Sequence, residues 1–388
     1  MVARAGYSRW LAQWLLCAAV LAMLAGCGTT YVAHAARGQW QVLRERRPIA
    51  EVVADPATPE ELRATLASVT AAREFASREL GLPDNGTYRS YTDLKRGYVV
   101  WNVVAAPEFS VTPQRWCFPI AGCVAYRGYF SEPKARSFAE RLRRRRYDVA
   151  VGGVAAYSTL GRFADPVLSS MVGYGEHELA AILFHELSHQ VVYVAGDSAF
   201  NEAFAVTVEQ AGLERWLAHR GQRSDVERFR ARRARQREYL DAFARRRAEL
   251  AALYASDLAP AAMRERKREV LEGLAADLRV IEQTQNARSQ YASWLEEGLN
   301  NAHLASVATY FDCVPGFVRL LAASGGDLQA FYGAVRELAR LPRAERHARV
   351  CSSVTSAQPA GGEHGSEGQR ADAEAGAAAL PADAVDRQ

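Results

Sequence analysis

The pattern of apolar and polar positions is helical over much of the chain. Apolar residues at helical spacing predict helices over 31–46 and 59–80. Thr58 is a suitable N-cap for the second of these, and Pro59 fits the first helical position. The turn-forming sequence Gly-Leu-Pro-Asp-Asn-Gly over 81–86 then predicts the end of that helix.

A smaller amount of β-structure is predicted in the middle of the chain. The valine-rich run 98–105 indicates a strand, and 147–160, rich in Val, Tyr and Gly, indicates strands or an extended edge. A short arginine-rich helix is predicted over 135–146. We therefore expect an α+β fold that is mostly α.

Helices are predicted again for the second half of the chain. Two of them cover about 176–220 and are joined at Gly196-Asp197-Ser198, where glycine ends the first and Asp197 or Ser198 caps the second. From 224 to about 299 the pattern is helical and highly charged, with a break at 258–260, so a long antiparallel helical hairpin is the simplest interpretation. Further helices are predicted over 301–323 and 327–338.

The N-terminal 26 residues have the pattern of an export signal. Arg4 and Arg9 precede an apolar run over 11–25, which is short for a membrane-spanning helix of about 20 residues. The run ends in Leu-Ala-Gly-Cys27, which resembles the lipobox of bacterial lipoproteins. That resemblance implies cleavage before Cys27, lipidation of Cys27 and attachment to a membrane through the lipid. Because Gly28 follows and not aspartate, it further implies the outer membrane, facing the periplasm. The alternative is an uncleaved membrane anchor.

The other end of the chain has a different composition. Residues 356–388 are rich in Ala, Gly, Glu, Asp and Gln and contain no aromatic residue, so we expect a disordered tail. The folded domain is therefore predicted to cover 27–355.

The overall charge does not indicate a nucleic-acid partner. The 48 basic residues nearly balance the 44 acidic ones, leaving a formal net charge of +4. Arginines do cluster, over 141–146 and 220–247, but no recognisable nucleic-acid-binding module accompanies them. We interpret these clusters as solvated faces of long helices.

The cysteines agree with export. Two of the six, Cys17 and Cys27, belong to the signal region. The other four are Cys117, Cys123, Cys313 and Cys351. An even number in an oxidising compartment permits disulfides. The short loop between Cys117 and Cys123 contains a proline and a glycine and can bring the two sulfurs together, so we expect this bond. Four cysteines allow three pairings, and the sequence alone does not choose among them.

The candidate chemistry lies in the sequence His185-Glu186-Leu-Ser-His189. Two histidines four apart share one helical face, so both imidazoles can reach a single metal ion. Glu186 points slightly aside, where it can accept a proton from an attacking water without entering the coordination shell. Apolar neighbours would bury this helix, which favours a metal site over a satisfied pair of core histidines: Leu179, Ile182, Leu183, Leu187 and Val191.

A catalytic zinc site usually has a third protein ligand. Glu202 falls in the first turn of the helix after Gly196, and a tight helix–turn–helix returns that turn to the first helix. Glu209, seven residues on, faces nearly the same way. It is predicted either to accept a hydrogen bond from a ligand histidine or to be the third ligand itself, with Glu202 favoured as the ligand.

At this point a family resemblance emerges. His-Glu-x-x-His followed by Asn201-Glu202-x-x-Ala205 resembles the gluzincin metallopeptidases, although the gap from His189 to Glu202 is shorter than in the thermolysin and large aminopeptidase families. Stretches 116–130, 156–161 and 300–310 extend the likeness to a bacterial family of predicted zinc aminopeptidase lipoproteins. The resemblance implies a gluzincin-like core, a Zn²⁺ cofactor, Glu202 as third ligand and a peptide substrate.

The resemblance also implies further parts of an active site. One is an edge strand that holds extended substrate, for which 151–160 is the candidate. Another is a transition-state donor, for which Tyr157 and Tyr310 are candidates, each with ordinary packing as the alternative. An aminopeptidase also needs an anion for the substrate amine. The candidates for it are Asp165, Glu176 and Glu178.

Two functions from different classes follow. The first is zinc-dependent hydrolysis of peptide bonds, as an aminopeptidase, with Glu186 as general base. The second is a non-catalytic binding or scaffold lipoprotein with a structural zinc, whose helical hairpin recruits a protein partner. Glu186 discriminates between them, because a structural site has no use for a carboxylate beside an open coordination position.

Overall fold

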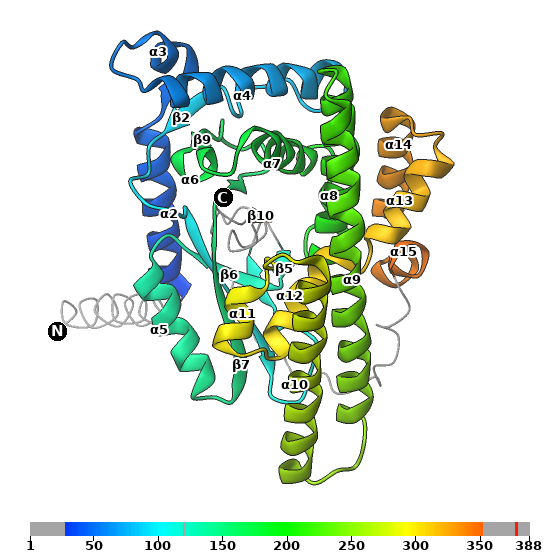
Figure 1. The fold of residues 1–388 in the computed structure, drawn as a ribbon. Coiled ribbons are helices and arrows are strands. Elements are labelled where there is room, and N and C mark those ends of the chain that lie inside the picture. Colours follow the sequence, from blue (N-terminus) through cyan, green and yellow to red (C-terminus); the bar gives the residue numbers. More distant parts are fainter. Residues whose placement is uncertain (1–27, 119–121, 352–376, 379–388) are drawn as a thin grey trace, which may run out of the picture.

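The computed structural model describes residues 28–118, 122–351 and 377–378 (Figure 1). The predicted export signal, with Cys27, lies outside these ranges, as does the predicted tail apart from residues 377 and 378. The helices are α2 (Gly28–Arg44), α3 (Ile49–Ala54), α4 (Glu60–Arg78), α5 (Glu132–Arg143), α6 (Ser169–Val172), α7 (Glu176–Ser188), α8 (Ser198–His219), α9 (Arg223–Tyr254), α10 (Pro260–Gln285), α11 (Ala292–Glu297), α12 (Asn301–Phe311), α13 (Val314–Ala323), α14 (Leu328–Arg340) and α15 (Arg343–Val350).

In the part of the chain that the structure describes, the strands form four small sheets. They are β1 (Arg47–Pro48), β2 (Ser90–Thr92), β3 (Val100–Pro107), β4 (Trp116–Phe118), β5 (Gly122–Val124), β6 (Tyr126–Tyr129), β7 (Tyr147–Val154), β8 (Tyr157–Ser158), β9 (Val167–Leu168) and β10 (Ala377–Ala378). Helices therefore dominate, which confirms the α+β, mostly α prediction.

The largest sheet has the strand order β6-β3-β7, and both pairings are antiparallel. Its register sets Trp101 opposite Tyr129 and Val104 opposite Ala150. Side chains alternate between the two faces of a strand, and Val103 of β3 packs with Ala139 of α5 in one apolar cluster. Helix α12 contacts β3 and β7 as well, so helices cover the sheet.

The other sheets connect distant parts of the chain. Strand β2 pairs antiparallel with β1 and parallel with β9, and β4 with β5 forms a hairpin. Strand β8 pairs antiparallel with β10, with Ala377 opposite Ser158. Two residues of the C-terminal segment thus form a strand against β8, which itself contacts α7.

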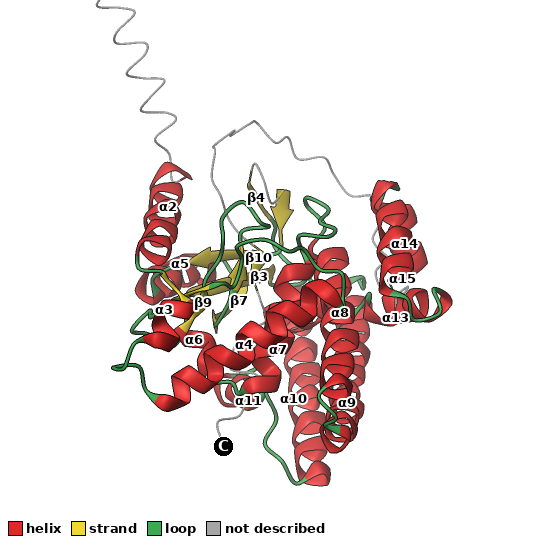
Figure 2. Ribbon diagram, turned by 90° about the horizontal axis from the view of Figure 1, so that it is seen from above, coloured by secondary structure: helices red, strands yellow, loops and turns green. Residues whose placement is uncertain are grey.

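Helices α7 and α8 form the centre of the molecule. They pack against each other, with α4 against α7 and with α12 and α13 against α8 (Figures 1 and 2). Phe184 on α7 and both Phe200 and Phe204 on α8 are fully buried. Because each helix is enclosed on several sides, most residues of both are buried, as expected of core helices.

The helical hairpin is present as α9 and α10, which run side by side in Figure 1. Its second arm ends earlier than the sequence predicts. Asn286 adopts a left-handed conformation (φ 48°) directly after Gln285, which terminates the helix, and the short α11 follows. The predicted arm to residue 299 is therefore wrong in its last turns.

The predicted helix over 301–323 is divided into α12 and α13. Pro315 lies in the first turn of α13, where its missing N–H is tolerated, and it cannot continue the hydrogen bonding of α12. By length and composition, Asn301–Ala323 resembles a membrane span, yet 61% of its most apolar window is buried inside the molecule. Because α12 packs against α8 and the sheet, we interpret this pair as core helices.

Candidate metal centre

The end of α7 and the start of α8 bring three possible metal ligands together. The ligand atoms of His185, His189 and Glu202 all lie within 4.8 Å of one another, and the three residues are buried. Glu202 Oε2 is 3.3 Å from His185 Nε2 and 3.8 Å from His189 Nε2. Donors at ~2.0–2.1 Å from a tetrahedral zinc ion are about 3.4 Å apart. The cluster is thus close to the size that one zinc ion requires.

The hydrogen bonding of the cluster gives an independent test of that fit. His185 Nε2, both ring nitrogens of His189 and Glu202 Oε2 are buried and have no hydrogen-bond partner. Buried polar atoms in proteins are nearly always satisfied, so this many unpaired atoms in one place indicate a missing charged partner. A divalent cation would satisfy the two imidazoles and the carboxylate together, and the residues fit one.

Glu209 lies behind His185 and outside this cluster. Its Oε2 accepts a hydrogen bond from His185 Nδ1 at 3.0 Å. That contact leaves Nε2 facing Glu202 and His189, which is the orientation a ligand histidine needs. Of the two roles considered for Glu209, its position in the structure matches the hydrogen-bond acceptor and not the third ligand.

Glu186 is in the same turn as His185 but is not in the three-ligand cluster. It is fully buried, and neither carboxylate oxygen has a hydrogen-bond partner. Burial raises the pKa of Glu186 to about 8; the nearby His185 opposes this rise, while Glu202, Asp165 and Glu209 add to it. A nearby cation would act in the opposite direction and favour the ionised carboxylate.

The ligand residues themselves compete for protons when no cation is present. Burial lowers the pKa of His185, but the carboxylates of Glu202 and Glu209 overcome this and raise it well above its usual range. The pKa of His189 is instead lowered well below its usual range by burial and by the charge of His185. Burial also raises the pKa of Glu202. Such opposed shifts in adjacent groups are typical of functional sites.

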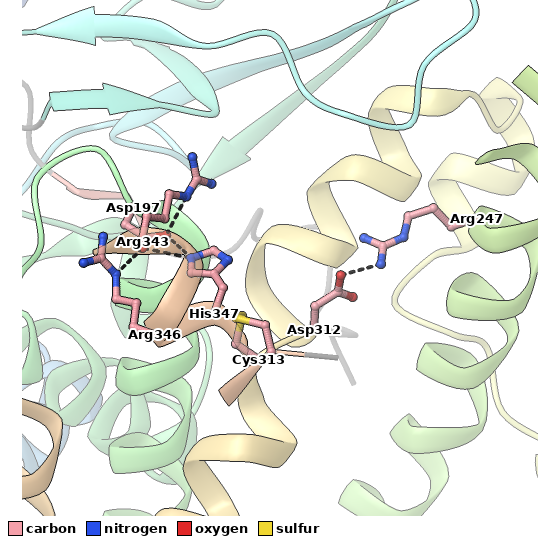
Figure 3. Close-up of a disulfide and its surroundings, with 8 residues drawn as sticks. Asp197, Arg247, Asp312, Cys313, Arg343, Arg346 and His347 are labelled. Atoms are coloured by element: carbon pink, nitrogen blue, oxygen red, sulfur yellow. Dashed lines mark hydrogen bonds and ion pairs between the residues drawn. A yellow bond between two sulfur atoms is a disulfide. The ribbon is translucent and has the colours of Figure 1, made fainter. Parts of the chain in front are cut away.

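The turn between α7 and α8 sets the position of Glu202. Side-chain hydrogen bonds on both sides hold this turn in place. Asn201 accepts a hydrogen bond from Val194 N and donates one to Val194 O, each at 2.8 Å. Asp197, at the N-cap of α8, is bound through its carboxylate by Arg346 at 2.6 Å and by His347 at 2.8 Å, both from α15 (Figure 3). We call Asp197, Arg343, Arg346 and His347 the Asp197 cluster.

Both disulfides lie beside this turn. The predicted Cys117–Cys123 bond is present, and the remaining pair is Cys313–Cys351, which the sequence left open. Arg115 donates hydrogen bonds to the carbonyl of Cys123 at 2.8 Å and, from the same nitrogen, to that of Gly196 in the turn. Cys351 follows α15 directly, so its disulfide connects the helix of the Asp197 cluster to the start of α13 (Figure 3).

The two candidate donor tyrosines have different surroundings. Tyr310 is buried, and the charges of Glu202 and Glu186 help burial to raise its pKa, so it lies near the metal centre. The Tyr157 hydroxyl donates a hydrogen bond to Gln39 of α2. Two tyrosines that the sequence did not indicate also lie near the centre. The Tyr193 ring is 6.3 Å from that of His189, and Tyr88 follows a loop that is hydrogen-bonded to Gln190, the residue after His189.

The candidate anions for a substrate amine all have partners. Asp165 accepts hydrogen bonds from Thr159 N at 2.8 Å and from Thr159 Oγ1, and burial raises its pKa to about 6. Glu176 accepts a hydrogen bond from Ser68 at 2.6 Å. It also pairs with Arg220, and Glu178 pairs with Arg232.

The candidate substrate-binding segment, 151–160, contains the end of β7 and all of β8. Strand β7 pairs with β3, and among the described residues no strand pairs with its other edge. Strand β8 lies against α7 and pairs with β10. Substrate binding by 151–160 stays a prediction.

Comparison with known proteins gives one result. A family model described as "Putative aminopeptidase" matches residues 30–350, which is most of the chain. Searches of curated proteins and of solved structures found no significant match. The matched range includes the candidate metal ligands, Glu186, the β6-β3-β7 sheet, the helical hairpin and all of α15. The chain therefore belongs to the family described as "Putative aminopeptidase".

Proposed function

We propose that this protein is a zinc-dependent aminopeptidase in which His185, His189 and Glu202 hold the metal and Glu186 is the general base. The observation that carries the proposal is the Glu186 carboxylate, which is fully buried and unpaired beside three ligands. An unpaired buried carboxylate destabilises a fold, so its presence beside three possible metal ligands supports a role in chemistry. Two nitrogen donors and one carboxylate oxygen also match the ligands of catalytic zinc sites.

The chemistry follows from the positions of the side chains. A zinc ion, when bound, supplies a Lewis acid that polarises a carbonyl and lowers the pKa of water. Glu186 accepts a proton from the attacking water as the new C–O bond forms, and it returns that proton to the leaving amine as the C–N bond breaks. Glu209 keeps the His185 ring oriented throughout through the 3.0 Å hydrogen bond to Nδ1.

The preference for a free N-terminus rests on the family description. None of Asp165, Glu176 and Glu178 is an unpaired anion, so the group that binds the amine is not assigned. We expect peptides with a free N-terminus to be cleaved faster than the same peptides after acetylation. Equal rates for the two would make the protein an endopeptidase and contradict the aminopeptidase proposal.

We further propose that the protein is an outer-membrane lipoprotein that acts on periplasmic peptides. The lipobox ending in Cys27 supports this, and two disulfides in the described residues fit an oxidising compartment. Cells that express Cys27→Ser should contain an unlipidated precursor that does not incorporate labelled fatty acid. Continued labelling of this variant would contradict the lipoprotein proposal.

The peptidase proposal is tested with purified protein that begins at Gly28 and keeps the rest of the chain. A mixture of synthetic peptides is incubated with the zinc-loaded protein, and mass spectrometry identifies the cleaved bonds. We expect cleavage that a chelator abolishes and zinc restores, and cleavage at least about 10²-fold slower by Glu186→Gln with equal zinc content. Bound zinc without cleavage of any peptide would instead favour the scaffold function, with the α9–α10 hairpin as the surface for a protein partner.

A further inference from the structure

Tyr88 has an unusual backbone conformation for a buried residue. Five non-glycine residues among those described have a positive φ angle, and Tyr88, at 60°, is the only one of them that is buried. Its exposed fraction is 2%. A bulky residue in this left-handed region is disfavoured by roughly 1–2 kcal/mol, and such residues concentrate at functional sites.

A buried arginine holds the loop that carries Tyr88. Arg73 of α4 is 1% exposed and lies inside the loop 83–87. It donates hydrogen bonds to three backbone carbonyls, those of Pro83 at 2.6 Å, Asn85 at 3.3 Å and Thr87 at 2.9 Å. Burying a guanidinium is costly unless it is well bonded, so the loop and Arg73 depend on each other. The buried guanidinium of Arg73 thus fixes the backbone of the residues just before Tyr88.

The same loop is attached to the metal centre. Asn85 donates a hydrogen bond to Gln190 Oε1 at 2.7 Å, and Gln190 directly follows the ligand His189. On the other side, Tyr88 N donates to the carbonyl of Asp165 at 2.7 Å. These contacts fix the Tyr88 backbone between the end of α7 and the loop that contains Asp165.

The hydroxyl of Tyr88 has no partner. It is buried and makes no hydrogen bond, which is uncommon for a buried tyrosine. Burial raises the pKa of Tyr88 well above its usual range, and the charge of Glu186 adds to this rise. The phenol stays protonated over the whole range in which a peptidase works, so it is available as a hydrogen-bond donor.

We propose that Tyr88 is a catalytic residue, whose hydroxyl donates a hydrogen bond to the substrate carbonyl oxygen as that oxygen becomes negative. This inference rests on the proposed peptidase function and assigns its transition-state donor. The loop fixes the Tyr88 backbone in advance, so little reorganisation is needed when the substrate binds. A donor held in this way stabilises the transition state more than the ground state.

The test compares Tyr88→Phe with Tyr332→Phe in the zinc-loaded protein. Tyr332 is a matched control, because it is also fully buried but its hydroxyl donates to the carbonyl of Leu80 at 3.0 Å. We expect Tyr88→Phe to lower kcat by about 10²–10³-fold with little change in KM or zinc content, as when one oxyanion donor is removed. Tyr332→Phe should keep wild-type kcat.

Thermal unfolding of the metal-free proteins gives a second readout. Removing an unsatisfied hydroxyl does not break a hydrogen bond, so Tyr88→Phe should unfold at the wild-type temperature or above it. Tyr332→Phe leaves the Leu80 carbonyl without a donor and should unfold a few degrees lower. A Tyr88→Phe midpoint that falls as far as that of Tyr332→Phe would show a structural role and overturn the proposal.

A third readout separates this proposal from the peptidase function. A peptide phosphinate resembles the tetrahedral transition state, and Tyr88→Phe should bind it about 10²–10³-fold more weakly than wild type does. If wild type cleaves peptides and Tyr88→Phe is equally active, only the assignment of Tyr88 fails. If Tyr310→Phe loses activity and Tyr88→Phe does not, the donor is Tyr310. Wild type that neither cleaves peptides nor binds the phosphinate would overturn the peptidase function and this proposal together.

Discussion

The metal centre and the Asp197 cluster are two groups of charged residues near the start of the same helix. Each contains a buried carboxylate, but the two carboxylates have opposite surroundings. Asp197 is only 1% exposed, and its carboxylate is bound by Arg346 and His347, with Arg343 3.8 Å away. In the metal centre, Glu186 is fully buried and neither of its carboxylate oxygens is bound.

The pKa shifts of the two carboxyl groups record this difference. Burial alone would raise the pKa of Asp197, but His347 and the neighbouring arginines lower it below its ordinary value. At Glu186 burial prevails, and the pKa rises to about 8. We therefore expect substitutions in the paired cluster to change stability, and substitution of the unpaired Glu186 to change activity.

The largest effect is expected at the unpaired carboxylate. Glu186→Gln keeps the size of the side chain but cannot accept a proton from the attacking water. Turnover should fall by about 10²–10⁴-fold, which is typical for loss of a general base, while zinc content stays at the wild-type level. Steady-state kinetics and metal analysis on the same preparation check this. Unchanged turnover would contradict the role of Glu186.

The paired cluster should respond in stability. Asp197→Ala leaves Arg346 buried without its carboxylate, and breaking a buried pair in this way costs roughly 3–5 kcal/mol in the free energy of unfolding. Urea denaturation measures the change. The matched control is Glu337→Ala, which removes an exposed carboxylate paired with Arg340 and should change stability by about 1 kcal/mol or less. Equal effects of the two substitutions would mean that the Asp197 cluster does not hold the fold.

The pH dependence of stability should separate wild type from Glu186→Gln when both are metal-free. In the folded state Glu186 keeps its proton up to a pKa of about 8, while in the unfolded state it ionises near the ordinary glutamate pKa of 4.5. The unfolded state therefore binds fewer protons between these values, and stability falls as the pH rises through this window. Wild type should lose on the order of a few kcal/mol more than the variant between pH 5 and pH 8. Parallel curves would contradict the raised pKa.

A smaller effect is expected from the two disulfides. The Cys313–Cys351 bond closes a separation of 38 residues, and the Cys117–Cys123 bond closes one of only 6. In the chain-entropy model the longer loop contributes roughly 1–2 kcal/mol more than the shorter one. The variant with Cys313→Ser and Cys351→Ser should therefore lose more stability than the variant with Cys117→Ser and Cys123→Ser. It should also bind zinc more weakly, because α15 is no longer held by the disulfide. Zinc affinity equal to wild type in this variant would show that α15 does not position Glu202.

The sequence predicted the parts of this site that are local. The spacing of His185 and His189 follows from helical periodicity, and Glu202 follows from the turn at Gly196, because a short turn returns the next helix to the first. The α9–α10 hairpin is also predicted from local features, namely two long charged helical stretches with a break at Pro260.

The parts that were missed depend on contacts between distant residues. Nothing near Asp197 indicates that Arg346, almost 150 residues later, would bind it, and α15 was not predicted at all. Tyr88 also has no local motif. Its importance lies in the loop around Arg73 and in the unpaired hydroxyl, and neither feature is visible before the chain is folded.

The central claim is that His185, His189 and Glu202 hold one zinc ion, with Glu209 supporting His185 from behind. The most direct measurement is a zinc titration of wild type, Glu202→Gln and Glu209→Gln, each prepared metal-free. We expect one zinc per wild-type chain, no tight binding by Glu202→Gln, and binding weakened by about 10–100-fold in Glu209→Gln. Release of zinc by Glu209→Gln with full retention by Glu202→Gln, or a wild-type protein that binds no zinc, would contradict the account.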